Sequence, residues 1–179
     1  NDPTTSRKGD IQDRQDWFND FNTFTRLVRR EHPRTRIVWC GESMGALIAL
    51  HAAATCSSKK QSPCDALILS SPITRIHEDF PQWKRTVLRW GASLFPRWKI
   101  SLETLSGENE VRVIRDVVHQ EQAQTNPYHV SAFTMRLLYT LGTMIETSTE
   151  QASRIDLPVL LLHGGHDIFS RPDDVKTFA

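Results

Sequence analysis

The chain has 179 residues, of which 39% are hydrophobic and 24% are charged, and its formal net charge is +1. This length and composition predict one globular unit with a sizeable core. The small net charge excludes recruitment of nucleic acid or acidic lipid by a global electrostatic field. No apolar run reaches the roughly 20 residues that a membrane-spanning helix needs, and the first residues do not resemble a signal peptide.

The first predicted elements in chain order are a loop and a long helix. Residues 1–10 are polar and contain Pro3 and Gly9, which is typical of a surface loop. Asp10 is predicted to cap the helix that follows, which ends near Pro33. Apolar residues recur in this helix at a spacing that predicts packing against a sheet. They are Ile11, Trp17, Phe18, Phe21, Phe24, Leu27 and Val28.

Three short apolar segments are predicted to be buried strands. They are residues 36–40, 65–70 and 158–163. Between the first two, residues 43–55 are rich in alanine and poor in charge, which predicts a nearly buried helix. A further helix is predicted to begin at Arg171. Short buried strands that alternate with helices indicate an α/β fold, with a mostly parallel sheet and helices on both faces.

The stretch from residue 73 to residue 155 breaks this alternation. It contains no clear buried strand but several helical patterns, among them residues 83–95 and 130–146. We therefore predict a helical cap inserted between two strands of the sheet. The core of the fold is then expected to consist of residues 1–72 and 156–179.

Cysteine and histidine usage predicts neither a disulfide scaffold nor a metal site. Cys40, Cys56 and Cys64 are too few and too irregularly spaced for either a disulfide framework or a zinc ribbon. Cys56 and Cys64 could bridge in an oxidising compartment, but free thiols in a reducing cytoplasm are favoured. His163 and His166 have no third ligand near them in the sequence, so no metal or other cofactor is expected.

Gly41-Glu42-Ser43-Met44-Gly45 has the G-x-S-x-G form of a nucleophile elbow. This motif requires a serine on a sharp turn between a strand and a helix. The turn is expected to crowd both flanking glycines. The helix that follows directs its positive end at developing negative charge, and the Met44 N–H is predicted to donate to an oxyanion. The alternative interpretation is a structural glycine turn.

The stretches GESMGALIALHAA, SSP and PVLLLHGGHDIFSRPDDV resemble the α/β-hydrolase group of monoacylglycerol lipases, lysophospholipases and related serine esterases of the S33 aminopeptidase type. The resemblance implies an α/β-hydrolase fold with Ser43 as the nucleophile and Asp167 as the acid. A turn or helix-capping aspartate is the alternative for Asp167. Asp173 and Asp174 suit the first turn of a helix, and Asp156 is expected at the opposite end of the sheet.

The base histidine of the family has no match in the chain. His163 is interpreted as a strand-end residue, because the family's oxyanion loop precedes the nucleophile. His166 is adjacent to Asp167 and is poorly placed to reach both that carboxylate and Ser43. By the resemblance, the base and the second oxyanion donor are expected outside these 179 residues. A chain without the base is expected to be inactive or incompletely folded.

The resemblance implies a serine hydrolase that cleaves carboxylic esters with a hydrophobic acyl group, such as monoacylglycerols or lysophospholipids. The alternatives are a peptidase or thioesterase of the same fold, and a non-catalytic binding domain. Nucleic acid is not an expected partner, and the oligomeric state is left open. Residues 75–99 mix basic and aromatic side chains, so the cap could touch a lipid interface or admit an acyl chain. Packing of these aromatics on the core is the alternative. Glu42 is either hydrogen-bonded under the cap or exposed without a role.

Overall fold

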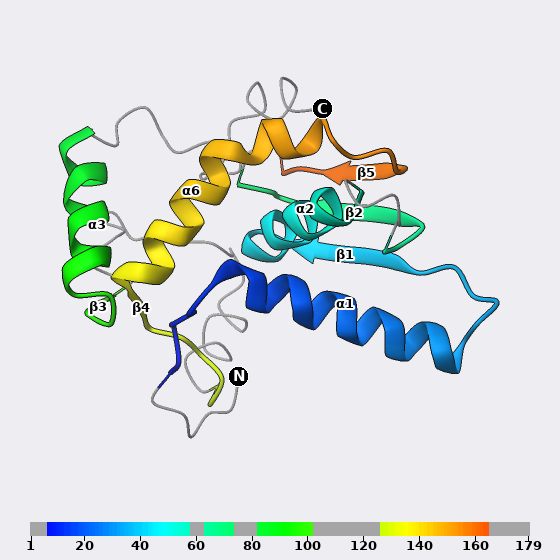
Figure 1. Ribbon diagram of the computed structural model, residues 1–179, viewed down its shortest axis with the longest axis horizontal. Helices are drawn as coiled ribbons and strands as arrows, with labels where there is room; N and C mark the ends of the chain where they lie inside the picture. The colour runs from blue at the N-terminus through cyan, green and yellow to red at the C-terminus, as the bar shows by residue number, and fades with distance from the viewer. Residues whose placement is uncertain (1–6, 58–62, 74–81, 102–125, 165–179) are drawn as a thin grey trace. The chain divides into compact units, whose positions relative to one another are not determined.

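The fold of the chain is shown as a computed structural model in Figure 1. The structure describes residues 7–57, 63–73, 82–101 and 126–164. Backbone contacts divide the chain into two compact units. The sheet unit comprises residues 13–80 and 140–179, and the hairpin unit comprises residues 1–12 and 81–139.

A parallel sheet forms the centre of the sheet unit. Its strands β1 (Val38–Glu42), β2 (Ala66–Ser70) and β5 (Val159–Leu162) lie in the order β1-β2-β5. Figure 1 shows the three strands side by side. The predicted strands and their parallel pairing are therefore confirmed, with boundaries that shift by at most two residues. The predicted burial is wrong for β5, in which Val159, Leu160 and Leu162 are exposed.

Helix α1 (Arg14–Glu31) begins three residues later than the sequence predicts. Its N-cap is Asp13, and Asp10 lies outside the helix. The Asp13 carboxylate accepts the N–H of Gln15 at 2.9 Å, and the Asp16 carboxylate accepts the N–H of Asp13 at 3.4 Å. This reciprocal capping box satisfies N–H groups that the first turn of a helix leaves without partners.

The aromatic stripe of α1 lies only partly in the core. Phe18 is buried and Trp17 and Phe21 are partly buried, whereas Phe24 is 70% exposed and Leu27 is also exposed. The part of the stripe that lies in the core is thus narrower than its spacing predicts.

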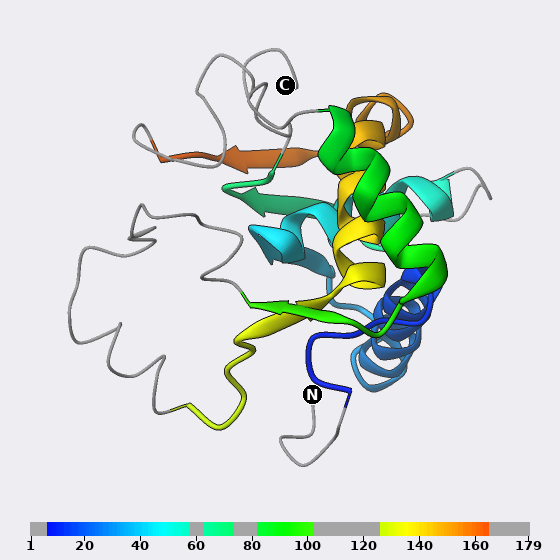
Figure 2. The ribbon, with the colours of Figure 1, turned by 90° about the vertical axis from the view of Figure 1, so that its left-hand side faces the viewer.

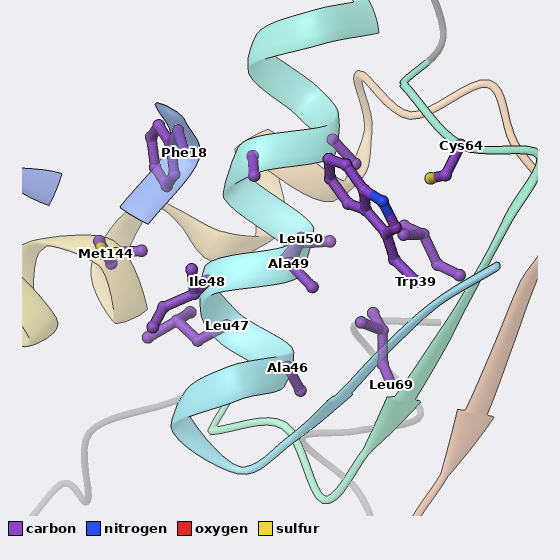
Figure 3. Close-up of a cluster of buried hydrophobic side chains, with 13 residues drawn as sticks. Phe18, Trp39, Ala46, Leu47, Ile48, Ala49, Leu50, Cys64, Leu69 and Met144 are labelled. Carbon is purple, nitrogen blue, oxygen red and sulfur yellow. The ribbon is translucent and has the colours of Figure 1, made fainter. Parts of the chain in front are cut away.

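Helix α2 (Met44–Ser57) is the buried helix that its alanine-rich sequence predicts. All side chains from residue 46 to residue 54 are buried. Figure 3 shows α2 between Trp39 and Leu69 of the sheet on one side and Phe18 and Met144 on the other. The Trp39 indole N–H donates to Thr25 Oγ1 at 2.8 Å, so the buried ring keeps a polar partner.

The two faces of the sheet differ in burial at β1 and β2, whereas β5 is exposed on both faces. Trp39, Leu67 and Leu69 point to the face that α2 covers, and all three are buried. On the opposite face, Val38 and Leu160 remain about half exposed, at 48% and 53%. Within the described residues, α1 and α2 thus supply the helical layer on one face only.

His51 is a buried histidine on α2, 3% exposed, with Nε2 2.8 Å from the Met144 carbonyl oxygen. A carbonyl oxygen only accepts, so the imidazole donates from Nε2. Burial lowers the pKa of His51, the bond to Met144 acts in the opposite sense, and the charge of Arg14 lowers the pKa further. The folded protein therefore holds this histidine neutral.

This burial predicts a stability that depends on pH. Because the pKa of His51 lies below its ordinary value of 6.5 in the folded state, the unfolded chain binds the proton first as the pH falls. The free energy of unfolding should therefore be largest above pH 6.5 and decrease below it, by up to about 1.4 kcal/mol per pH unit from this group. Urea unfolding between pH 8 and pH 5 measures the slope. His51→Gln should flatten it, and His32→Gln, at an exposed position, should not.

The hairpin unit contains a short antiparallel ladder that the sequence pattern does not predict. Strand β3 (Lys99–Ser101) pairs with β4 (Ala132–Thr134), and β4 runs directly into helix α6 (Met135–Ala152) (Figure 2). Helix α3 (Gln82–Leu94) precedes β3 and matches a predicted helical pattern. Strands of three residues are too short to show an alternation that could be recognised in the sequence.

Asp10 fixes the start of the hairpin unit to the first turn of α6. Its carboxylate accepts hydrogen bonds from Thr134 Oγ1 at 2.8 Å and from Arg136 Nη2 at 2.6 Å. Burial raises the pKa of Asp10, but the bonds from Arg136 and Thr134 and the charge of Arg136 outweigh it, so the pKa lies below 3.8. This contact replaces the helix-capping role predicted for Asp10.

Loss of this carboxylate should destabilise the protein. Asp10→Asn removes a charge-assisted pair that is largely shielded from water, and we expect a cost of about 1.5–3 kcal/mol in chemical unfolding. Because the pKa of Asp10 is lowered, its contribution should persist above pH 3.8 and disappear as the pH falls further. Glu150→Gln breaks the exposed pair with Arg154 on α6 and is the matched control, with an expected cost below about 0.5 kcal/mol.

Helix α6 continues from the hairpin unit into the sheet unit. Its residues from Thr140 onward belong to the sheet unit, because Leu141, Met144 and Ile145 pack in its core. The cap limits at residues 73 and 155 stay a prediction. None of the helices in the described part of the chain has both the length and the apolar character required to cross a membrane.

Candidate active site

The backbone around Ser43 forms the sharp strand-to-helix turn that the motif predicts. Strand β1 ends at Glu42, α2 begins at Met44, and Ser43 between them has a φ of 51°. A left-handed backbone is unfavourable for a residue with a side chain, by about 1–2 kcal/mol. Such strain persists only where the surrounding structure imposes it.

Hydrogen bonds on both sides impose this conformation. The Ser43 N–H donates to the Ser70 carbonyl oxygen of β2 at 2.9 Å, which continues the sheet ladder to the serine. The Ser43 carbonyl oxygen accepts the N–H groups of Ala46 and Leu47 at 3.1 and 3.2 Å, which closes the first turn of α2. Ser43 therefore belongs to the sheet and to the helix at once.

The two glycines of the motif differ in the space around them. A Cβ on Gly41 would lie 2.6 Å from Ala46 N and 2.6 Å from Gly45 C, both backbone atoms that cannot move aside. A Cβ on Gly45 would meet no atom within 4 Å. The predicted crowding is thus found at Gly41 but not at Gly45, because the backbone of Gly45 is itself what fills the space beside Gly41.

The residues around the turn are open to solvent. Glu42, Ser43 and Met44 are exposed, although Gly41 before them and Ala46 after them are buried. The exposure of Glu42 agrees with the exposed alternative for this residue. The Met44 N–H is the first amide of α2, and the first amides of a helix have no carbonyl partner within it. The positive end of the helix therefore lies beside the serine.

A second strained serine lies at the same edge of the sheet. Ser71 follows β2 directly, has a φ of 44°, and donates its N–H to the Leu162 carbonyl oxygen of β5 at 2.8 Å. Ser43 and Ser71 are the non-glycine residues with positive φ in the described part of the chain. The motif does not include Ser71, and the sequence gives no local signal for its positive φ, because the following Pro72 favours an extended backbone before it.

The carboxyl ends of β1, β2 and β5 lie at one edge of the sheet, and the residues that follow these strands therefore lie there together. They are Ser43, Ser71 and His163, which follows β5 directly and is half-buried. Asp156 is exposed and precedes β5, at the opposite edge, as predicted. The predicted acid Asp167 and its neighbour His166 lie outside the described residues, as do Asp173 and Asp174.

The three cysteines form no disulfide, and their surroundings differ. Cys40 is exposed, Cys56 is partly buried, and Cys64 is buried. Burial raises the pKa of the Cys64 thiol to about 11, so this thiol stays protonated at neutral pH. In the described parts of the chain, no three His, Cys, Asp or Glu side chains are grouped so that they could hold a metal ion.

Comparison with solved structures identifies the fold. A monoacylglycerol lipase from Paleococcus ferrophilus has a TM-score of 0.73 at 18% identity, over 92% of this chain and 59% of the lipase. A soluble variant of monoglyceride lipase from Saccharomyces cerevisiae, in complex with a substrate analog, has a TM-score of 0.72 at 19% identity, over 94% of this chain and 56% of the lipase. A carboxyl esterase from Bacillus coagulans has a TM-score of 0.61 at 20% identity, over 85% of this chain and 53% of the esterase.

These similarities show an α/β-hydrolase fold, and the chain spans less than two thirds of the length of each of these enzymes. No curated protein sequence matches the chain. The family model described as serine aminopeptidase, S33, matches residues 3–179, which is nearly the whole chain. The parallel sheet, the buried helix α2 and this match lead to one conclusion: the chain belongs to the S33 serine aminopeptidase family of α/β-hydrolases.

Proposed function

We propose that the full-length protein containing this chain is a serine hydrolase that cleaves carboxylic esters with a hydrophobic acyl group. The observation that carries the proposal is the backbone of Ser43, held at a φ of 51° and exposed between β1 and the buried helix α2. A strained conformation in an exposed turn is typical of a functional residue. The family membership and the lipase and esterase neighbours support a hydrolase.

In the proposed mechanism, Ser43 Oγ attacks the ester carbonyl carbon and its proton passes to a histidine that the family supplies outside these residues. Asp167 orients that histidine. The tetrahedral oxyanion accepts a hydrogen bond from the Met44 N–H at the positive end of α2. Collapse expels the alcohol, which takes the proton from the histidine, and water then releases the acid from Ser43 by the same steps.

Monoacylglycerols and lysophospholipids are the proposed substrates. The support comes from the two lipases of similar fold, which are named for monoacylglycerol cleavage. Such substrates reside in lipid surfaces. We therefore also propose that the helical cap, residues 73–155, contacts a lipid interface. The absence of a disulfide among the three cysteines supports a reducing, cytoplasmic location for the protein.

Amide cleavage is the second candidate, because the family description names aminopeptidases. An ester, a thioester and an amide with the same acyl group distinguish the candidates when each is offered to the full-length protein. We expect the highest kcat/KM for the ester. A fluorophosphonate probe should label Ser43 in the same protein. A folded full-length protein that neither reacts with the probe nor cleaves any of the three would be a non-catalytic member of the family.

The isolated chain should not turn over these substrates. A serine without a base remains a weak alcohol nucleophile, and we propose that the histidine is supplied from outside residues 1–179. Ester turnover by the purified 179-residue chain that is lost in Ser43→Ala would contradict this part of the proposal.

A further inference from the structure

Helix α3 presents its largest apolar side chains to solvent. Trp83, Val87, Trp90 and Leu94 are 62%, 54%, 63% and 64% exposed. Their spacing of four, three and four residues places them within about 60° of arc on one side of the helix. Large apolar side chains gathered on one exposed face indicate an interaction surface. We call these four residues, with Phe95 and Trp98, the tryptophan face.

The opposite side of α3 carries its partly buried residues, which are Arg85, Leu88, Gly91 and Ala92. Gly91 and Ala92 are only partly exposed, and a Cβ on Gly91 would collide with the side chain of Met135 at the start of α6. A side chain at Gly91 would require the terminal methyl group of Met135 to move aside. The helix thus buries this side in part, whereas Trp83 and Trp90 on the other side remain exposed.

The turn after α3 extends the tryptophan face and is firmly held. Phe95 and Trp98 are 59% and 66% exposed, and their rings meet edge to face with centroids 6.2 Å apart. The first amides of α6 donate to this turn, from Met135 to the Trp98 carbonyl oxygen at 2.8 Å and from Arg136 to the Pro96 carbonyl oxygen at 3.2 Å. The aromatic side chains are therefore presented by a fixed backbone.

The charge of this segment has a single sign. Residues 82–101 contain five basic residues and no acidic one, although the whole chain has a net charge of only +1. Arg89, Arg97 and Lys99 are exposed. Basic side chains beside exposed tryptophans are complementary to a binding partner that has an apolar interior and a negatively charged outer layer.

We propose that the tryptophan face docks on the surface of an anionic phospholipid bilayer. The indole rings would occupy the boundary between headgroups and acyl chains, where tryptophan is favoured, and the basic side chains would contact lipid phosphates. The helix lies along the membrane in this arrangement. This docking rests on the proposed function, which has the cap touching a lipid interface. It assigns that contact to the tryptophan face and to a negatively charged lipid.

Sedimentation of the full-length protein with vesicles tests this docking without any turnover. We expect binding to mixed phosphatidylcholine–phosphatidylglycerol vesicles, weaker binding to pure phosphatidylcholine, and a loss of the difference at high salt. Trp83→Ala combined with Trp90→Ala should reduce the partition coefficient at least tenfold. Arg97→Glu combined with Lys99→Glu should reduce binding to the anionic vesicles by about fivefold or more for each cation removed.

Matched variants show whether a loss of vesicle binding comes from the tryptophan face or from misfolding. They also distinguish failure of the docking from failure of the proposed hydrolase activity. Phe24→Ala removes a similarly exposed aromatic side chain on α1 and should bind vesicles like the wild type. Ser43→Ala should also bind normally while losing probe labelling. Equal binding to both vesicle types, or unchanged binding by the double tryptophan variant, overturns the proposal. So does a dimer that the tryptophan variant converts to a monomer in light scattering, because a second copy would then cover the face.

Discussion

Ser43→Ala in the full-length protein is expected to abolish fluorophosphonate labelling and to reduce kcat for ester substrates by about 10⁵–10⁶-fold. The loss should be this large because, in the proposed mechanism, the hydroxyl forms the covalent bond to the acyl group. Alanine should leave the fold intact, since Ser43 is exposed and its structural bonds use backbone atoms. Unfolding curves of the variant and the wild type verify this point.

Ser70→Ala is the matched control for the loss of activity. Ser70 ends β2 beside Ser43, and its carbonyl oxygen accepts the Ser43 N–H, a bond that alanine retains. Labelling and turnover of this variant should stay close to wild type. If Ser43→Ala kept its labelling while Ser70→Ala lost it, the nucleophile would have to be assigned elsewhere.

Gly41→Ala is expected to lower the free energy of unfolding by about 3 kcal/mol or more. The added methyl group would meet the backbone of Gly45 and Ala46 at distances that real Cβ atoms do not adopt. Relief would require β1 and α2 to separate, and α2 is the most buried helix of the sheet unit. Thermal or urea unfolding of the full-length protein measures the effect.

Gly45→Ala provides a control of the same chemistry four residues away. Its Cβ would enter open space, and alanine favours helix by about 1 kcal/mol over glycine in a helix interior. Stability should therefore be unchanged or slightly higher. Equal destabilisation by the two substitutions would show that the turn is crowded on both sides, contrary to the observed geometry.

The strand, the turn and the buried helix around Ser43 could be predicted because they depend on neighbouring residues. The β-branched and aromatic run before Gly41 and the alanines after Gly45 specify burial on both sides of the turn. The predicted α1 boundary was wrong for a different reason. Asp10 and Asp13 are equally suited to cap a helix in sequence, and only the contact of Asp10 with Arg136 decides between them.

The sequence by itself therefore determined the α/β pattern, the elbow-like motif and the amphipathic character of α3, since each is a local periodicity or spacing. The tertiary structure decided which atoms fill the space at each glycine, that Ser71 shares the edge of Ser43, and that the tryptophans of α3 are directed outward. These features depend on strand register and on which face of a helix a distant residue covers. Hydrophobic spacing marks an apolar face, but only the fold shows whether that face is covered.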